Sequence, residues 1–164
     1  MTTPLTLPTI REARAIDMPD IASMFGQLYA DVSEMGGVQA SRDTQALRLE
    51  TALHGYLDKT IYSVCLVAGS PAQAFTLWAV TEESHPTLGC VAEALATYVR
   101  PGWRKLGLAS RLYRVALGQL AHMGVTTLVA LTETANQGGQ ALLKRQGFEP
   151  AQVIYTRRLD PDGE

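Results

Sequence analysis

A strand-helix-strand pattern in the C-terminal half constrains the fold of this chain more than any other feature of its sequence. Residues 90–99 form a long strand candidate, and residues 108–123 form the strongest helical pattern. The almost wholly apolar residues 125–131 are typical of a strand buried on both faces. The three segments predict a β-α-β crossover with two parallel strands. The helical positions expected to face inward are Leu108, Leu112, Val115 and Leu120.

The N-terminal half predicts one strand, two helices and a β-hairpin. Residues 9–15 are strand-like, and Asp17 then stands where a helix N-cap is expected. Residues 61–68 and 74–80 have strand composition on either side of a Gly-Ser-Pro turn, which predicts a hairpin. The apolar face expected on the first helix consists of Ile21, Met24, Phe25, Leu28, Tyr29 and Val32. The face expected on the second helix consists of Ala46, Leu49, Leu53, Tyr56 and Leu57.

Two further elements complete the predicted order. Residues 135–146 predict a helix that Gly147 ends, and residues 153–159 predict a last strand. The full order is β-α-α-β-β-β-α-β-α-β, with antiparallel strands first and the crossover after them. This order predicts an α/β fold of the α+β kind, in which helices pack on both faces of a mixed sheet. A length of 164 residues fits a single domain that spans residues 1–164.

Composition argues against several classes of partner. The chain has 14 basic and 16 acidic residues, and it lacks the basic stripe that is typical of nucleic-acid binding. No apolar run approaches the roughly 20 residues of a membrane span, and the N-terminus lacks the basic and apolar regions of an export signal. Cys65 and Cys90 form no C-x-x-C pair, so we expect them in the core of a protein from a reducing compartment. We therefore predict a cytoplasmic protein that contacts neither nucleic acid nor a membrane.

The sequence contains no pattern for a metal centre or for a common nucleophilic site. His54, His85 and His122 lie far apart, without the i, i+4 spacing of a metal-binding helix. The sequence contains neither the phosphate-binding loop of nucleoside triphosphatases nor the G-x-S-x-G nucleophile elbow. Cys90 lies on a suitable strand for a nucleophile but has no histidine partner. We expect no metal in the protein.

One segment has the features of a phosphate-binding loop. The strand that ends at Val99 runs into a Pro-Gly turn, and a helix begins after Gly107. The first amides of a helix lack internal partners and carry the positive end of the helix dipole. Glycine lets an anion approach the backbone closely, and Arg104 and Lys105 add positive charge. The simpler interpretation is that Arg104 and Lys105 are a solvated charge pair.

The pattern R-x-x-G-x-A of this segment, formed by Arg104, Gly107 and Ala109, resembles the acyl-CoA pyrophosphate loop of the GNAT family of N-acetyltransferases. Asn136 and, further along the chain, the pair Gly147-Phe148 are similar to the family's second motif. The opening strand and helix start also resemble those of the family. The resemblance implies a GNAT-like acyl-CoA N-acyltransferase fold, with acetyl-CoA as the co-substrate.

The resemblance also implies binding roles for two segments. The pyrophosphate would be held by the loop amides and the positive residues beside them, which are Arg104, Lys105, Leu106, Gly107, Leu108 and Ala109. The backbone of Leu95, Thr97 and Val99 would pair with pantetheine, because the two central parallel strands of this fold splay apart. An amide near Thr97 would polarise the thioester carbonyl. Asn136 would contact the pantetheine or the thiol, and it is equally expected as a helix N-cap.

Glu93 is the candidate general base. A carboxylate inside an apolar strand must be paired, solvated in a cleft or shifted in pKa. In the histone-acetylating branch of the family, a glutamate on this strand acts as the base. An amine nucleophile is mostly protonated near neutral pH, so the base has a proton to remove. The alternative is a structural glutamate at an edge, or one paired with Arg100 or Arg111.

The candidate general acid departs from the family pattern. Many members carry a tyrosine four residues before the glycine of the G-F pair, but this chain has Leu143 there, which cannot donate a proton. We take Tyr98 as the substitute, with Tyr113 and Tyr155 as other candidates. Each of these tyrosines is more often a packed aromatic residue. A thiol with a pKa of about 8.5 also leaves without full protonation.

The resemblance implies transfer of an acetyl group from acetyl-CoA to an amine, by direct attack in a ternary complex. The expected acceptor is a small molecule or a peptide. Leu143 keeps an alternative open, in which the chain binds acyl-CoA without catalysis and acts as a sensor or partner module. The short segment after Phe148 leaves the acceptor site either open or completed by a second copy in a homodimer.

Overall fold

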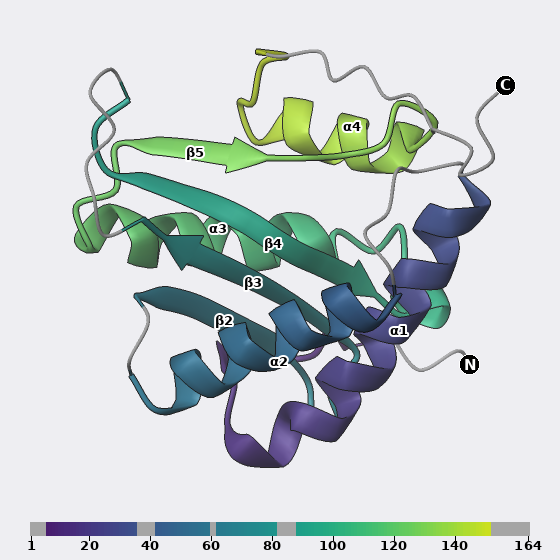
Figure 1. Ribbon diagram of the computed structural model, residues 1–164. Coiled ribbons are helices and arrows are strands. Elements are labelled where there is room, and N and C mark those ends of the chain that lie inside the picture. Colours follow the sequence, from purple (N-terminus) through teal and green to yellow (C-terminus); the bar gives the residue numbers. More distant parts are fainter. Residues whose placement is uncertain (1–5, 36–41, 60–61, 82–87, 152–164) are drawn as a thin grey trace, which may run out of the picture.

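The computed structural model describes residues 6–35, 42–59, 62–81 and 88–151, and a five-stranded mixed sheet lies at its centre (Figure 1). Strands β1 to β4 pair in antiparallel order, and β5 pairs in parallel with β4. The strands are β1 (Ile10–Glu12), β2 (Ser63–Ala68), β3 (Ala74–Val80), β4 (Val91–Val99) and β5 (Thr127–Ala130). The predicted hairpin and crossover are therefore confirmed. The strand predicted at 153–159 lies outside the described residues.

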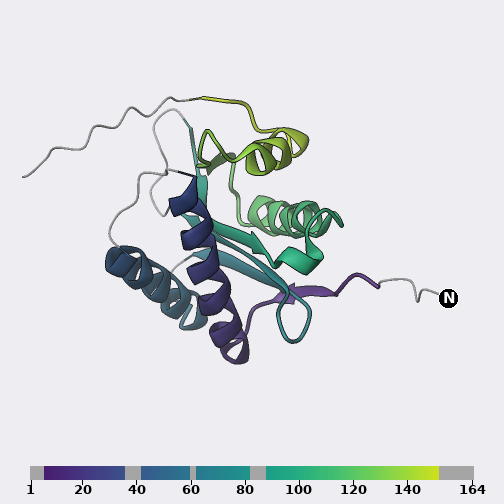
Figure 2. The same cartoon turned by 90° about the vertical axis from the view of Figure 1, so that its right-hand side faces the viewer.

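Helices cover both faces of the sheet, as predicted (Figure 2). On one face lie α1 (Met18–Glu34) and α2 (Arg42–Leu57), and on the other lie α3 (Leu108–His122) and α4 (Gln137–Arg145). Two short 3-10 helices, η1 (Ala15–Asp17) and η2 (Pro101–Trp103), precede α1 and follow β4. None of the described helices is long and apolar enough to cross a membrane.

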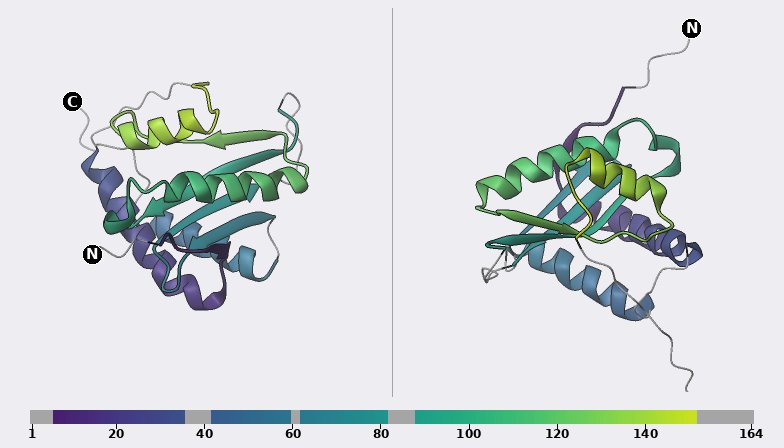
Figure 3. Two further views of the ribbon diagram at one scale, coloured as in Figure 1. Left: turned by 180° about the vertical axis from the view of Figure 1, so that it is seen from behind. Right: turned by 90° about the horizontal axis from the view of Figure 1, so that it is seen from above.

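The core has two apolar layers, one on each face of the sheet. The layer under α1 and α2 includes Ile21, Met24, Leu49, Leu53, Phe75 and Leu77. The layer under α3, which crosses the opposite face (Figure 3), includes Leu66, Trp78, Leu108, Leu112, Ala116 and Leu120. The expected inward position of Val115 is wrong, because its side chain is 40% exposed while Tyr113 is buried. The side chains at positions 108, 112, 116 and 120 face the sheet, so the side chain at position 115 points outward.

Strands β4 and β5 stay together for only part of their length. Their pairing runs from Val91 opposite Thr127 to Ala94 opposite Ala130, after which β4 continues to Val99 without β5 beside it (Figure 1). The expectation of a strand buried on both faces is wrong for β5, whose residues are only half-buried. In the described sheet β5 is an outer strand, so its far edge has no strand to cover it. The divergence leaves one edge of the second half of β4 unpaired within the described sheet.

A β-bulge lies where β4 begins to leave β5. Leu77 of β3 pairs with Ala96 and Trp78 pairs with Ala94, so Leu95 is the extra residue. The bulge reverses the alternation of side chains along β4. Before it, Ala92 and Ala94 face α3, and after it Ala96 and Tyr98 face α1 and α2.

Candidate functional site

The unpaired edge of β4 presents backbone groups to the gap left by β5. The amide of Arg100 donates to Gln73 O at 2.9 Å, on the β3 side. Because successive residues of a strand point their amides to opposite sides, the N–H groups of Thr97 and Val99 face away from β3. These are two of the residues predicted to pair with pantetheine. The structure therefore supplies an open strand edge at the predicted place.

The loop before α3 turns its amides outward around Gly107. Lys105 and Gly107 have positive φ values of 64° and 78°, and Gly107 is the N-cap of α3. The amide of Arg111 donates to Gly107 O at 3.1 Å, which closes the first turn of the helix. The amides of residues 108–110 therefore have no partner inside the helix. A Cβ placed on Gly107 would meet nothing within 4 Å, so the space in front of this backbone is open.

Arg104 does not extend freely into this loop. Its Nη2 donates to Asp31 Oδ2 of α1 at 2.9 Å, and its Nε donates to Val99 O at 2.9 Å. Its guanidinium carbon lies 5.0 Å from the centre of the Tyr98 ring, which is a cation-π distance. Arg104 is therefore partly solvated, as the simpler interpretation expected, but it is also paired with Asp31. Lys105, by contrast, is exposed.

Arg111 is a candidate anion-binding residue that the sequence analysis considered only as an ion-pair partner of Glu93. Its Nη1 atom is buried and has no hydrogen-bond partner in the described part of the chain. Side chains on a helix lean toward the helix N-terminus, so Arg111 leans toward the turn at Gly107. An orphaned guanidinium nitrogen one turn from free helix amides is suited to an anion. The sequence signal was the i+4 spacing between Gly107 and Arg111, which places both on one side of the first turn.

Asn136 is the N-cap of α4, and its Oδ1 accepts a hydrogen bond from Gly139 N at 2.8 Å. The structural role expected for this residue is confirmed. At the other end of α4, Gly147 has φ 84°, and Phe148 N donates to Leu143 O at 3.0 Å. This is the geometry of a Schellman motif. The Leu143 side chain packs with Phe148 against the α3 layer of the core.

The structure places Glu93 and Tyr98 on the same face of β4 but does not bring them together. Glu93 is exposed, whereas Tyr98 is only 5% exposed. Five residue steps with one bulge separate them, which is roughly 13 Å along the strand. Glu93 makes no ion pair within the described residues, so pairing with Arg100 or Arg111 is wrong. The two groups cannot contact one reacting atom from these positions.

Tyr98 lies between β4 and α1 with its hydroxyl buried. That hydroxyl has no hydrogen-bond partner among the described residues. Burial raises the pKa of Tyr98 above its usual range, Arg104 opposes the rise, and the Asp31 carboxylate adds to it. The hydroxyl is therefore protonated at neutral pH and available as a donor.

A buried hydrogen-bond chain fixes Thr97 from the α3 side. Trp78 Nε1 donates to Thr76 Oγ1 at 2.9 Å, and the hydroxyls of Thr76 and Thr97 are 2.7 Å apart. Burial raises the pKa of Tyr113, and a hydrogen bond with Thr97 opposes this rise. Satisfied buried networks of this kind hold their members rigidly. The strand that carries the open amide of Thr97 is therefore well anchored.

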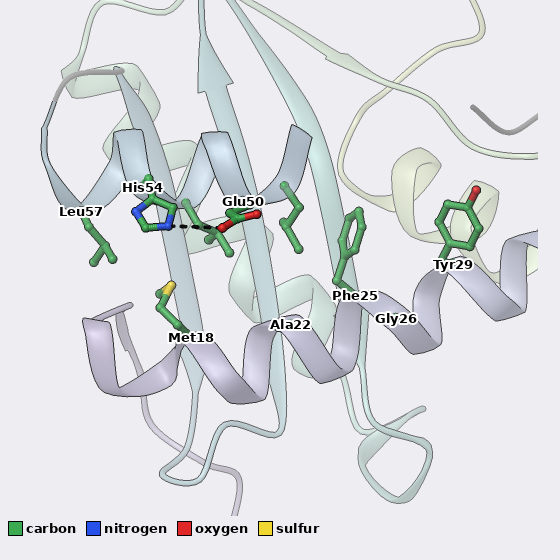
Figure 4. A pocket seen from close by; sticks show the side chains of 10 residues that line it. Met18, Ala22, Phe25, Gly26, Tyr29, Glu50, His54 and Leu57 are labelled. Atoms are coloured by element: carbon green, nitrogen blue, oxygen red, sulfur yellow. Dashed lines mark ion pairs between the residues drawn. The ribbon is translucent and has the colours of Figure 1, made fainter. Parts of the chain in front are cut away.

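A groove of about 480 Å³ lies between α1 and α2, away from the loop at Gly107. Side chains from the two helices face each other across it (Figure 4). Glu50 and His54 form an i, i+4 pair at 3.8 Å on its α2 side. The remaining lining is mostly apolar: Met18, Ala22, Phe25, Tyr29, Leu49, Leu53 and Leu57. No group of three or more metal-ligating side chains occurs among the described residues.

Comparison with known proteins supports the family resemblance. Residues 71–148, from the turn before β3 to the end of the α4 motif, match the model of the acetyltransferase (GNAT) family. The matched segment contains the open edge of β4, the loop at Gly107 and Asn136. This segment of the chain matches the GNAT family, the family that the resemblance implied. A comparison with curated proteins gives no match.

Solved structures share the fold. A predicted acetyltransferase from Clostridium acetobutylicum with acetyl-CoA superposes with a TM-score of 0.72 at 16% identity, covering 92% of this chain and 95% of that one. An apo aminoglycoside antibiotic 6′-N-acetyltransferase from Acinetobacter haemolyticus has a TM-score of 0.65 at 18% identity, with 93% and 99% covered. A GCN5-related N-acetyltransferase from Ralstonia eutropha has a TM-score of 0.71 at 20% identity, with 92% and 97% covered. At these identities the likeness establishes the fold.

Proposed function

We propose that the protein transfers an acetyl group from acetyl-CoA to an amine, by direct attack in a ternary complex. The observation that carries this proposal is the open edge of β4 beside the free amides of α3, within the segment that matches the family. The relative from Clostridium acetobutylicum, which has acetyl-CoA in its structure, supports the choice of co-substrate.

The residues at the start of α3 fit a pyrophosphate. The amides of residues 106–109 lie around Gly107, and the space in front of Gly107 is open. The exposed Lys105 is next to them in the chain. Arg111 adds a buried guanidinium nitrogen that lacks a partner within the described residues. The edge of β4 from Leu95 to Val99 would pair with the amides of pantetheine, as one strand pairs with another. Asn136 already caps α4, so its remaining Nδ2 is the group that would reach the pantetheine.

The catalytic roles are divided between β4 and its neighbours. Glu93 is exposed on the α1 and α2 face, where it would accept the proton of the attacking amine directly or through water. The amide of Thr97 points into the gap beside β4, where it would donate to the thioester carbonyl. Tyr98 would supply a proton to the leaving sulfur, although its distance from Glu93 demands that the two act on different atoms. Tyr113, which lies in the α3 layer with Leu143, is the alternative donor.

The acceptor would enter from the face that carries α1 and α2. Glu93 opens to this face, and the groove between the two helices gives it an apolar surface. A small-molecule acceptor is supported by the aminoglycoside acetyltransferase that shares the fold. A peptide acceptor and completion of the site in a homodimer stay predictions, as does the absence of nucleic-acid and membrane partners.

Two measurements test the proposal. Calorimetric titration with acetyl-CoA should show binding, and absence of binding would contradict both catalysis and the sensor role. Release of free CoA with a mixed panel of amines then separates the two roles. Turnover with at least one amine supports the transferase. Tight binding without turnover would support the non-catalytic module, which the leucine at position 143 favours.

A further inference from the structure

Arg104 connects the two substrate regions of the proposed site. It follows η2 at the start of the loop, yet its side chain turns back toward β4 and α1. The C-terminal half of α1 passes close to the end of β4 (Figure 1). Arg104 Nη2 donates to one oxygen of Asp31, and Arg104 Nε donates to the carbonyl of Val99, each at 2.9 Å. Val99 O lies on the strand edge proposed for pantetheine, and Asp31 belongs to α1, on the face proposed for the acceptor.

Asp31 depends on Arg104 for its counter-charge. Helix α1 contains no lysine or arginine, and within the described residues Arg104 is the cation that pairs with Asp31. Gln27 Nε2 donates to the other Asp31 oxygen at 3.1 Å, but it carries no charge. The Asp31 side chain is 26% exposed, so a ligand can reach it. A partly buried carboxylate that loses its cation would favour another cation in its place.

The pair between Arg104 and Asp31 is of a kind that a stronger partner can replace. Arg104 is 45% exposed, and exposed ion pairs contribute little to stability. A pyrophosphate presents several charged oxygens, and guanidinium groups bind such oxygens through paired, charge-assisted hydrogen bonds. The proposed pyrophosphate position, at the amides of residues 106–109, begins two residues after Arg104. The same ligand brings amides that compete for Val99 O.

The buried hydroxyl of Tyr98 is a second observation that points to a ligand site at this place. Its ring lies beneath the Arg104 guanidinium, and its hydroxyl is buried without a partner among the described residues. Buried polar groups are nearly always hydrogen-bonded, so an orphaned hydroxyl calls for an explanation. Withdrawal of Arg104 would uncover the Tyr98 hydroxyl beside the released Asp31 carboxylate. A carboxylate and a hydroxyl oxygen are the acceptors that an ammonium group with three N–H donors prefers.

We propose that Asp31, with Tyr98, binds a cationic group of the acceptor other than the amine that attacks, and that Arg104 pairs with Asp31 until an anionic co-substrate draws its guanidinium away. The inference rests on the proposed function, because it needs a pyrophosphate at the loop. It gives the two substrates a preferred order, with CoA binding increasing the affinity for a cationic amine. By thermodynamic linkage the amine increases the affinity for CoA by the same factor.

The test compares Asp31→Asn with Glu34→Gln in calorimetric titrations with CoA. Both variants remove one carboxylate charge from α1, but among the described residues Arg104 forms its ion pair with Asp31 and not with Glu34. Asp31→Asn should bind CoA about two- to fivefold more tightly than the wild type, because its Arg104 is already free. Glu34→Gln should bind CoA like the wild type. A purely structural role for Asp31 would weaken CoA binding instead.

A second titration uses 1,4-diaminobutane as the cationic probe and 1,4-butanediol as its uncharged control. In the wild type, saturating CoA should increase the affinity for the diamine at least threefold and leave the diol unchanged. In Asp31→Asn the diamine should bind weakly with or without CoA. The Arg104→Gln variant without CoA should bind the diamine with the same affinity as the wild type has for it at saturating CoA.

Three results would overturn the inference while leaving the proposed function intact. They are equal CoA affinity in Asp31→Asn and Glu34→Gln, weaker CoA binding in Asp31→Asn, and diamine binding that does not respond to CoA. Absence of CoA binding to the wild type would overturn both the proposed function and the inference that rests on it.

Discussion

Gly107 is the residue on which the proposed co-substrate site depends most directly. Its φ of 78° disfavours any other residue, and the space in front of it is open. Gly107→Glu would place a carboxylate where a pyrophosphate is expected, so we predict at least a 100-fold loss of acetyl-CoA affinity, or about 3 kcal/mol. Gly107→Ala provides the control for backbone strain alone and should lose much less. Equal affinities of Gly107→Glu and Gly107→Ala, measured by calorimetry, would place the pyrophosphate elsewhere.

Glu93 is tested by removing its charge while keeping its shape. Glu93→Gln cannot accept the proton of the amine, so kcat should fall roughly 100-fold with little change in acetyl-CoA affinity. Glu149→Gln is the matched control, because Glu149 is also exposed but lies beyond α4. The measurement is the kcat profile of both variants over roughly pH 6 to 9. A Glu93→Gln profile that matches the wild type would assign Glu93 a structural role.

Individual roles could be predicted from the sequence only where they depend on neighbouring residues. The glycine at the start of α3 and the cap at Asn136 follow from local helix rules, and the structure shows both. The contact between Arg104 and Asp31 joins residues 73 positions apart. A single sequence carries no local signal for such a contact. The same is true of the orphaned nitrogen of Arg111, because burial depends on elements that pack around it.

At the scale of elements, hydrophobic periodicity predicted the positions of the strands and helices well. It predicted their burial and strand pairing less well. The order of elements was predicted correctly as far as α4, because a turn residue stands wherever the spacing of apolar residues changes between helical and strand periodicity. The prediction for β5 failed because an apolar run does not reveal how completely the helices cover the two faces of the strand. The bulge at Leu95 was also missed, since it arises from the pairing of β3 with β4 and not from β4 alone.

Helix α4 offers a paired test of local packing. A Cβ on Gly139 would lie 2.6 Å from Asn136 Nδ2 and 2.7 Å from Thr132 Oγ1, whereas on Gly138 its nearest atom would be 3.8 Å away. Gly138→Ala should therefore stabilise the protein by roughly 0.5–1 kcal/mol through helix propensity. Gly139→Ala should destabilise it by about 1 kcal/mol, because the Asn136 cap must move. Urea unfolding measures both, and equal effects of the two substitutions would contradict this account of the cap.

At the scale of the whole molecule, one buried ion pair attaches the N-terminal strand to the first helix. Asp17 is 3% exposed, and both of its oxygens accept hydrogen bonds from Arg11 of β1 at 2.7 Å. Asp17 also accepts from Arg14 N at 2.8 Å, instead of capping α1 with its side chain as the sequence predicted. Arg11 further donates to Gly69 O at 3.2 Å, beside the β2–β3 turn. The cluster therefore joins the sheet edge to the helical layer.

The stability of the whole chain should carry the pH signature of this pair. The hydrogen bond from Arg11 lowers the pKa of Asp17 below its usual range. A carboxyl with a lowered folded-state pKa stabilises the protein at pH values above its unfolded pKa of about 3.9. This contribution is lost as the pH falls through the folded-state pKa. Asp17→Asn should thus cost about 2–3 kcal/mol at pH 7, since the buried pair is broken but Arg11 keeps some access to water.

The difference between the wild type and Asp17→Asn should shrink in strong acid, because the wild-type carboxyl is then also uncharged. Urea unfolding from about pH 7 down to about pH 2 measures this convergence, with the exposed Asp58→Asn as the control for charge alone. Coincident transitions by circular dichroism and tryptophan fluorescence would support the predicted single domain over residues 1–164. A constant difference between the two proteins across the whole pH range would contradict the ion pair, because an interaction between uncharged groups has no reason to disappear in acid.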